Sequence, residues 1–188
     1  MKTLKIISIA IAVIIALPLI VALFVPKTFT VSVSETINQP RQRVYDYVRI
    51  LDNQKDYSVW VMADSSLNPE IIGKDGTVGA VQKWNSQIDD VGEGEQEIKA
   101  LTPERMDVEL RFKRPFAGTA KAANIFKFIS ENKTLLTSEF YSDSKYPMNL
   151  PSYLFGRKMM EDAQTKNLQN IKRILENPNS FGISDVSN

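Results

Sequence analysis

The chain has 188 residues, 43% hydrophobic and 24% charged, and this length suits one domain with an appendage. Its 23 Lys and Arg residues are balanced by 22 Asp and Glu residues, so no basic surplus supports nucleic-acid binding. The sequence has no cysteine and no histidine, which excludes disulfides, zinc–thiolate sites, His-ligated metals and catalysis by Ser-His-Asp or Cys-His systems. These absences favour a binding protein over a hydrolase, and we expect no metal and no cofactor.

The N-terminus carries a long apolar run. Residues 6–25 contain one serine, one proline and no charge, and as a helix they would span about 30 Å, the thickness of the bilayer core. The run is longer than the apolar region of a signal peptide, about 7–15 residues, and no small-x-small cleavage site closes it. We therefore predict an uncleaved single-pass transmembrane helix over 6–25, with a cleaved signal peptide as the alternative.

The charges around this run predict its orientation. Lys2 and Lys5 precede it, and Lys27 follows it closely. The positive-inside rule then predicts a cytoplasmic tail at residues 1–5 and a domain on the other side of the cell membrane, in the periplasm. Without Lys2 and Lys5 the chain has 21 basic and 22 acidic residues. We therefore do not expect the exported domain to bind anionic lipid electrostatically.

After the apolar run, the first elements are a strand and two short helices. Residues 28–37 alternate between apolar and polar, which predicts a half-buried strand. Pro40 can open a helix over 41–51, and a second short helix is expected from residue 52 to about 59.

The second half of the chain changes from strands to a helix. Between residues 66 and 142, turn sequences separate short alternating runs, which predicts an antiparallel meander. After Pro147 the period becomes helical, and a long helix is expected with Asn149 as its N-cap. We expect this helix to end at Asn177-Pro178 and the tail 178–188 to be flexible.

Charged residues predict how the strands pair. Opposite charges face each other if the paired positions of 94–101 and 106–113 sum to 208. The pairs expected on the outer face are Lys99–Glu109, Glu97–Arg111, Glu95–Lys113, Lys83–Glu95 and Glu109–Lys121. The inner face of the hairpin then carries Gln96, Ile98, Ala100, Val108, Leu110 and Phe112. The carboxylates of this ladder are therefore interpreted as a solvated face and not as a metal site.

The inner face mixes large aromatic residues, small residues and uncharged polar groups. A solid core usually avoids so many polar groups, whereas a ligand cavity combines apolar walls with a few orienting amides. In this interpretation Gln82 and Gln96 lie side by side, and Gly156 leaves room on the long helix. The alternative is a packed core with these amides at wet sheet ends. The candidate cavity residues are Gln82, Trp84, Gln96, Phe112, Asn124, Phe126, Phe128, Ser138, Phe140, Gly156 and Met160.

Three segments in this order resemble the START-like (SRPBCC) superfamily, the polyketide cyclase/dehydrase and lipid transport family. They are VSVSETINQPRQRVYDYV (31–48), NPEIIGKDGTVGAVQKWNS (68–86) and GEGEQEIKALTPERMDVELRFKRPF (92–116). The resemblance implies an α+β helix-grip fold over residues 28–177, in which a curved seven-stranded antiparallel sheet wraps around the long C-terminal helix and encloses a hydrophobic cavity. Members of this superfamily include lipid carriers, hormone receptors, aromatase/cyclases and chaperone activators, so the fold does not fix the activity.

Three functions remain open from the sequence. The first is a membrane-tethered, extracytoplasmic binding or carrier module for a hydrophobic small molecule or lipid. The second is a protein-interaction module without a ligand, such as an envelope stress or assembly factor. The third is a cyclase or dehydratase acting on a polyketide-like substrate. Its candidate acids are Glu139, Tyr141 and Tyr153, but the superfamily has no universal catalytic motif to transfer.

Overall fold

The structure, a computed structural model, describes residues 2–177. The predicted tail 178–188 therefore lies outside the described residues. The strands are β1 (Thr28–Ile37), β2 (Glu70–Ile72), β3 (Val81–Asn85), β4 (Glu93–Thr102), β5 (Arg105–Arg114), β6 (Gly118–Ser130) and β7 (Lys133–Asp143). The helical segments are α1 (Lys2–Ala22), α2 (Arg41–Val48), η1 (Leu51–Asn53), α3 (Gln54–Tyr57), α4 (Val59–Ala63), α5 (Asn149–Pro151), η2 (Ser152–Gly156) and α6 (Arg157–Glu176).

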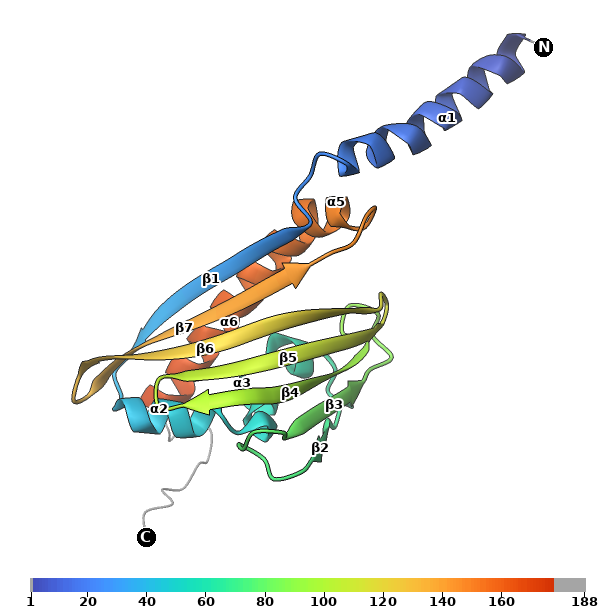
Figure 1. Ribbon diagram of the computed structural model, residues 1–188. Helices are drawn as coiled ribbons and strands as arrows, with labels where there is room; N and C mark the ends of the chain where they lie inside the picture. Colours follow the sequence, from blue (N-terminus) through green and yellow to red (C-terminus); the bar gives the residue numbers. More distant parts are fainter. Residues whose placement is uncertain (1, 178–188) are drawn as a thin grey trace.

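The strands form one seven-stranded antiparallel sheet in the order β1-β7-β6-β5-β4-β3-β2. α6 runs along the concave face of this sheet, and α2 and α3 cover the same face at the end remote from α1 (Figure 1). The predicted α+β class, with a long C-terminal helix against an antiparallel sheet, is confirmed. The sheet begins at its edge strand β1, which follows α1 directly, so one end of the sheet lies at the base of α1.

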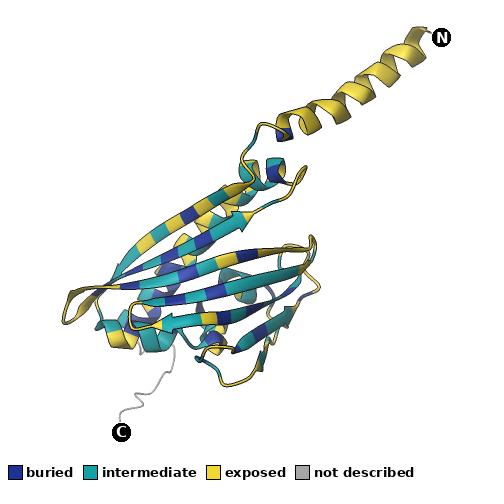
Figure 2. Cartoon of the chain, in the orientation of Figure 1, coloured by how far each residue is buried: buried dark blue, intermediate teal, exposed yellow. Residues whose placement is uncertain are grey.

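α1 is long and apolar enough to cross a membrane by length and composition, and a signal sequence near an N-terminus has the same features. Figure 2 shows it exposed along its length. The helix begins before the predicted run 6–25 and ends earlier, at Ala22. The chain turns at this point, because the amides of Leu23 and Phe24 bond the carbonyls of Ile20 and Val21.

The sequence predicted Asn149 as the N-cap of the long helix, and this prediction is wrong. Its side chain is 1% exposed, and its Nδ2 donates to the carbonyl oxygens of Ala22 at 2.7 Å and Val25 at 2.9 Å. Asn149 therefore caps the C-terminal end of α1, whose last carbonyls have no partner within the helix. The chain reaches α6 through η2, a π-helical turn.

The core is unevenly distributed along the sheet. At the end remote from α1, a large buried cluster joins the sheet to α2, α3 and the C-terminal half of α6. At the α1 end, a second cluster contains three buried residues, Val31, Ala120 and Phe140. The remote end therefore supplies most of the apolar burial that stabilises the fold.

The pairing of β4 with β5 differs from the prediction by two residues. Glu95 faces Arg111 and not Lys113, and Glu97 faces Glu109. At the tight turn, Thr102 lies opposite Arg105. A bulge between Ile98 and Ala100 then shifts the register by one residue, so that Glu95 and Glu97 lie on the outer face.

From Gly94 to Ile98, the shift of two residues keeps each side chain of β4 on its predicted face, since side chains in a strand alternate with a period of two. Beyond the bulge the faces exchange. Ala100, predicted on the inner face, faces Asp107 on the outer face, and Leu101 takes the inner position beside Met106. The predicted pairs Lys83–Glu95 and Glu109–Lys121 are confirmed.

The outer face yields a first prediction, at Arg111. Its guanidinium bonds Glu95 at 2.6 Å, Glu97 at 3.0 Å and Glu109 at 2.5 Å. The Arg111→Ala substitution removes the cation shared by three glutamates and leaves Glu97 facing Glu109, although Lys99 still pairs with Glu97 at 2.9 Å, so we expect a loss of about 1 kcal/mol of unfolding free energy. Urea unfolding of the full chain in detergent, followed by tryptophan fluorescence, measures this loss. Lys113→Ala, which removes one exposed partner of Glu93, is the control and should barely change the midpoint.

Candidate functional site: the concave face at the α1 end

The concave face at the α1 end is apolar and incompletely covered. Its three buried residues are surrounded by hydrophobic side chains that remain partly exposed: Phe29, Val33, Leu110, Phe112, Ala122 and Met160. We call these nine residues the α1-end cluster. Strand alternation aims the sheet residues at α6, and Met160 approaches them from the first turns of α6. The cluster is therefore an apolar wall with part of its surface still open.

Small residues in β6 leave space beside the large ones. Leu110 of β5 pairs with Ala120, and Phe140 of β7 pairs with Ala122. Alanine reaches only a short distance above the sheet. Ala120 and Phe140 are nevertheless buried, whereas Leu110 and Phe112 remain partly exposed. A mostly apolar concave face is typical of ligand sites.

Gly156 adds room on the helical side. It ends η2, and a Cβ built there would meet only the Ser152 hydroxyl, at an ordinary contact distance of 3.6 Å. Tyr153, one turn earlier, lies edge-on to Phe29 with ring centroids 6.5 Å apart. The helical wall therefore contains an aromatic ring and a position without a side chain.

Trp84 borders the cluster from β3. Its ring lies edge-on to Phe112 at 6.2 Å between centroids, and its Nε1 donates to the Val91 carbonyl at 3.2 Å. The indole also covers Gly94, where a Cβ would lie 2.6 Å from the Trp84 Cζ2. Because Gly94 has no side chain, the indole can lie flat in this position beside Phe112.

Gln82 and Gln96 lie side by side, as predicted, and both are buried. Gln96 Nε2 donates to Gln82 Oε1 at 2.5 Å and to Gln54 Oε1 at 2.7 Å. Gln82 Nε2 donates to the carbonyl of Leu51 at 2.8 Å. The two amides therefore join the sheet to η1 and α3 and do not extend toward the α1-end cluster.

This network yields a second prediction. Gln82→Leu removes the donor for the buried Leu51 carbonyl and one acceptor of Gln96, so we expect a loss of about 1–3 kcal/mol of unfolding free energy. If the two amides had no hydrogen-bond partners in the protein, the substitution would leave the unfolding free energy unchanged or raise it. Gln87→Leu, at an exposed position, is the matched control in the same urea titration.

The remaining predicted site residues are spread along the sheet. Ser138 Oγ donates to Gln164 Oε1 of α6 at 2.9 Å, and half-buried Asn124 faces Ser138 across β6 and β7. Phe126 is fully buried against Tyr45 in the large cluster. Phe128 is 55% exposed, close to the hairpin that joins β6 and β7. The structure thus brings Phe112, Phe140 and Met160 together in the α1-end cluster, with Trp84 against Phe112. Gly156 lies one turn before Met160 in the helical segment.

The candidate acids of the enzyme hypothesis do not share one site. Glu139 and Tyr141 lie on the outer face, where the Tyr141 hydroxyl donates to the Glu139 carboxylate and Arg105 bonds both. Tyr153 stands at the α1-end cluster. Among the described residues, no group of three or more Asp and Glu is placed to hold a metal ion.

Two surface pockets flank this end of the sheet. One, of 330 Å³, is formed by β1, β5, β6 and β7 and includes Phe29 and Ala120 of the cluster. The other, of 460 Å³, lies at the β3 edge and includes Trp84 and Asp64. Hydrogen bonds from Ser66 and Ser86 lower the pKa of Asp64, so its carboxylate is ionised at neutral pH. Neither of these two pockets lies between α6 and the sheet.

Comparison with known proteins rests on structure, since no protein-family model and no curated protein matches the sequence. Norcoclaurine synthase from Thalictrum flavum superposes with a TM-score of 0.62 at 9% identity, covering 80% of this chain and 94% of its own. Ara h 8.0201 gives 0.58 at 15% identity, covering 80% of this chain and 99% of its own. The chain has a helix-grip fold.

The same helix-grip fold occurs in DynU16, a protein of the dynemicin biosynthetic locus, with a TM-score of 0.55 at 13% identity. That match covers 79% of this chain and 48% of DynU16, so this chain spans about half the length of that protein. At such low identities the similarity shows the fold. The helix-grip architecture of the resemblance is therefore confirmed.

Several residues of the α1-end cluster were not among the predicted site residues. Phe29, Val31 and Val33 were visible as one face of the first strand, and Leu110, Ala120 and Ala122 as inner residues of the meander. The alternation of the strands indicated that these residues lie on the inner face, but it did not indicate at which end of the sheet they lie. Their importance depends on which end α2 and α3 cover, and local periodicity does not contain this information.

Proposed function

We propose that this protein is a membrane-tethered module that binds a hydrophobic small molecule or lipid on the α1-end cluster, between the sheet and the start of α6. The observation that carries the proposal is the contrast between the two ends of the concave face. The large cluster at the remote end has 15 buried residues, whereas the α1-end cluster has three buried and six partly exposed residues. Three of those six, Val33, Leu110 and Ala122, also pack against the large cluster. Exposed apolar surface in a concavity is a common mark of a binding site.

The position of α1 supports the tether. As a transmembrane helix it would hold the α1 end of the sheet next to the bilayer, where hydrophobic ligands are concentrated. The basic residues Lys2 and Lys5 before it support a cytoplasmic N-terminus, with the unit 28–177 on the opposite side of the membrane, in the periplasm. A Cys introduced at exposed Gln87 of this chain, which has no cysteine, would react with an impermeant maleimide on intact spheroplasts in that orientation.

Binding is favoured over catalysis by the state of the candidate acids. A neighbour in structure, norcoclaurine synthase, is an enzyme by name. In this chain Glu139 and Tyr141 bond each other on the outer face, away from the α1-end cluster. A protein-interaction module without ligand is the second candidate, because the Gln82 and Gln96 amides already have partners within the protein.

Native mass spectrometry of the full chain, released from lipid nanodiscs, tests the proposal. We expect a population that retains one apolar molecule or lipid after the other lipids have been removed. Photo-crosslinking with a diazirine-bearing fatty acid in the same nanodiscs should then modify peptides that contain Phe112 and Met160. A chain that is always empty, with no adduct on these peptides, would contradict ligand binding and favour the interaction module.

A further inference from the structure

A group of exposed apolar side chains surrounds the start of α6. Leu154, Phe155 and Met159 lie on the side of η2 and α6 that faces away from the sheet, and Phe155 is 72% exposed. Tyr146 and Met148, in the connection from β7, are also exposed. We call these five residues the α6 patch. Large hydrophobic side chains collected in one short segment are unusual at a free surface and indicate an interaction site.

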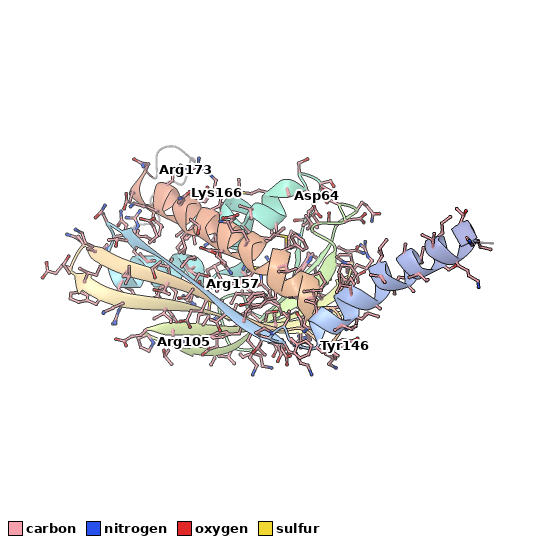
Figure 3. The ribbon with its side chains drawn as sticks, turned by 90° about the horizontal axis from the view of Figure 1, so that it is seen from above. Asp64, Arg105, Tyr146, Arg157, Lys166 and Arg173 are labelled. Carbon is pink, nitrogen blue, oxygen red and sulfur yellow. The ribbon has the colours of Figure 1, made fainter. Side chains whose placement is uncertain are left out.

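The α6 patch lies at the base of α1. The buried Asn149 amide, between Met148 and Leu154 in the chain, bonds the carbonyls of Ala22 and Val25 at the end of α1. Figure 3 shows Tyr146 beside this base, and Figure 1 shows α5 at the point where α1 leaves the domain. Leu23 and Phe24, which directly follow α1, are also exposed. The patch is therefore continuous with the apolar surface of α1.

Charged residues of both signs surround the patch. Lys145, Arg157 and Lys158 lie between residues 143 and 162, together with Asp143, Glu161 and Asp162. Lys158 pairs with Asp162 at 2.5 Å. Lys27 follows α1 and is exposed. Basic residues beside exposed Leu, Phe and Met residues are the composition of a surface that contacts lipid headgroups.

We propose that the α6 patch docks on the surface of the bilayer that α1 crosses. This inference rests on the proposed tether, because α1 must span the membrane to bring the patch to the interface. The occupant is the lipid surface, because the patch lies at the base of α1, held there by Asn149, and continues the exposed apolar surface of that helix.

Docking has a consequence for the ligand site. Tyr153 and Met160 alternate with the patch residues in the same turns and pack against residues of the sheet. A docked patch therefore places the α1-end cluster at the headgroup level. An apolar molecule can then pass between bilayer and protein without crossing water.

Nitroxide labels in the full chain, reconstituted in phosphatidylcholine and phosphatidylglycerol vesicles, test the docking. The chain has no cysteine, so a label on Phe155→Cys is unique. We expect this label to lie about 5–10 Å below the phosphates, with collisions dominated by oxygen and not by a water-soluble nickel complex. A label on Ile129→Cys, exposed near the far hairpin, is the matched control and should report water.

The variants separate the two proposals. A label on Ile14→Cys, within α1, reports whether α1 spans the bilayer. If Ile14 is in lipid and Phe155 is in water, the docking is wrong and the tether stands; if Ile14 is in water, the tether itself is wrong. Dipolar broadening between Phe155 labels would contradict lipid docking and assign the patch to a second copy.

Two matched double variants test whether the apolar side chains of the α6 patch hold it in the headgroup region. Leu154→Ser with Phe155→Ser should move a label on Met159→Cys out of the headgroup region, because two apolar side chains no longer enter it. Phe128→Ser with Ile129→Ser, an equivalent pair at the opposite end, should leave that label at its depth. An unchanged Met159 label in the first double variant would overturn the role of the patch.

Discussion

Gly156→Phe is expected to abolish retention of an apolar ligand while the protein still folds. A Cβ at this position meets only the Ser152 hydroxyl at 3.6 Å, and the backbone φ of −62° suits any residue. A benzyl group attached there enters the space beside Tyr153 and Met160 that the ligand would use. Native mass spectrometry should show the bound mass lost, and fatty-acid crosslinking to the peptide with Met160 should disappear.

Two control variants show whether the loss of ligand comes from the phenyl ring at position 156. Gly156→Ala adds one methyl group and removes a helical glycine, so it should keep the ligand and keep or raise stability, by up to about 1 kcal/mol. Lys166→Phe puts the same aromatic group on an exposed position of α6 and should leave binding unchanged. Full ligand retention by Gly156→Phe would show that the open surface beside Gly156 is not the binding site.

Much of the sheet could be predicted from local pattern. Alternation in 28–37 gave the face of β1, and opposite charges placed Lys83 against Glu95 and Glu109 against Lys121. These inferences succeed because a strand has a period of two and because charges avoid the buried face. The same reasoning placed Gln82 beside Gln96.

Features that depend on contacts distant in the sequence were not predicted. The bulge between Ile98 and Ala100 follows from the competition between a tight turn and the charge pattern, and its position is not encoded in either alone. Asn149 had the residue type and spacing of an N-cap, but its partner is Ala22, which lies 127 residues away in the sequence. The amides of Gln82 and Gln96 were placed correctly, yet their partners Leu51 and Gln54 come from helices whose packing the pattern does not describe.

The two ends of the concave face should also respond differently to the loss of an aromatic ring. Phe126 is fully buried in the large cluster and packs edge-on against Tyr45 at 5.2 Å. Phe126→Ala should therefore cost about 3–5 kcal/mol of unfolding free energy, a large part of the usual 5–15 kcal/mol of a domain. Phe112 is only half-buried in the α1-end cluster, so its truncation removes less apolar contact and should cost clearly less.

Ligand retention should show the reverse order. Phe112→Ala removes a wall of the proposed site and its contact with Trp84, so the folded protein should retain less ligand in native mass spectrometry. Folded Phe126→Ala, examined without urea, should keep its ligand, because the missing ring lies at the remote end. Urea unfolding in detergent, followed by the fluorescence of Trp60 and Trp84, gives the stability of each variant on the same samples. If Phe112→Ala lost as much stability as Phe126→Ala and retained ligand normally, the α1 end would be ordinary core, and the binding function proposed for it would be wrong.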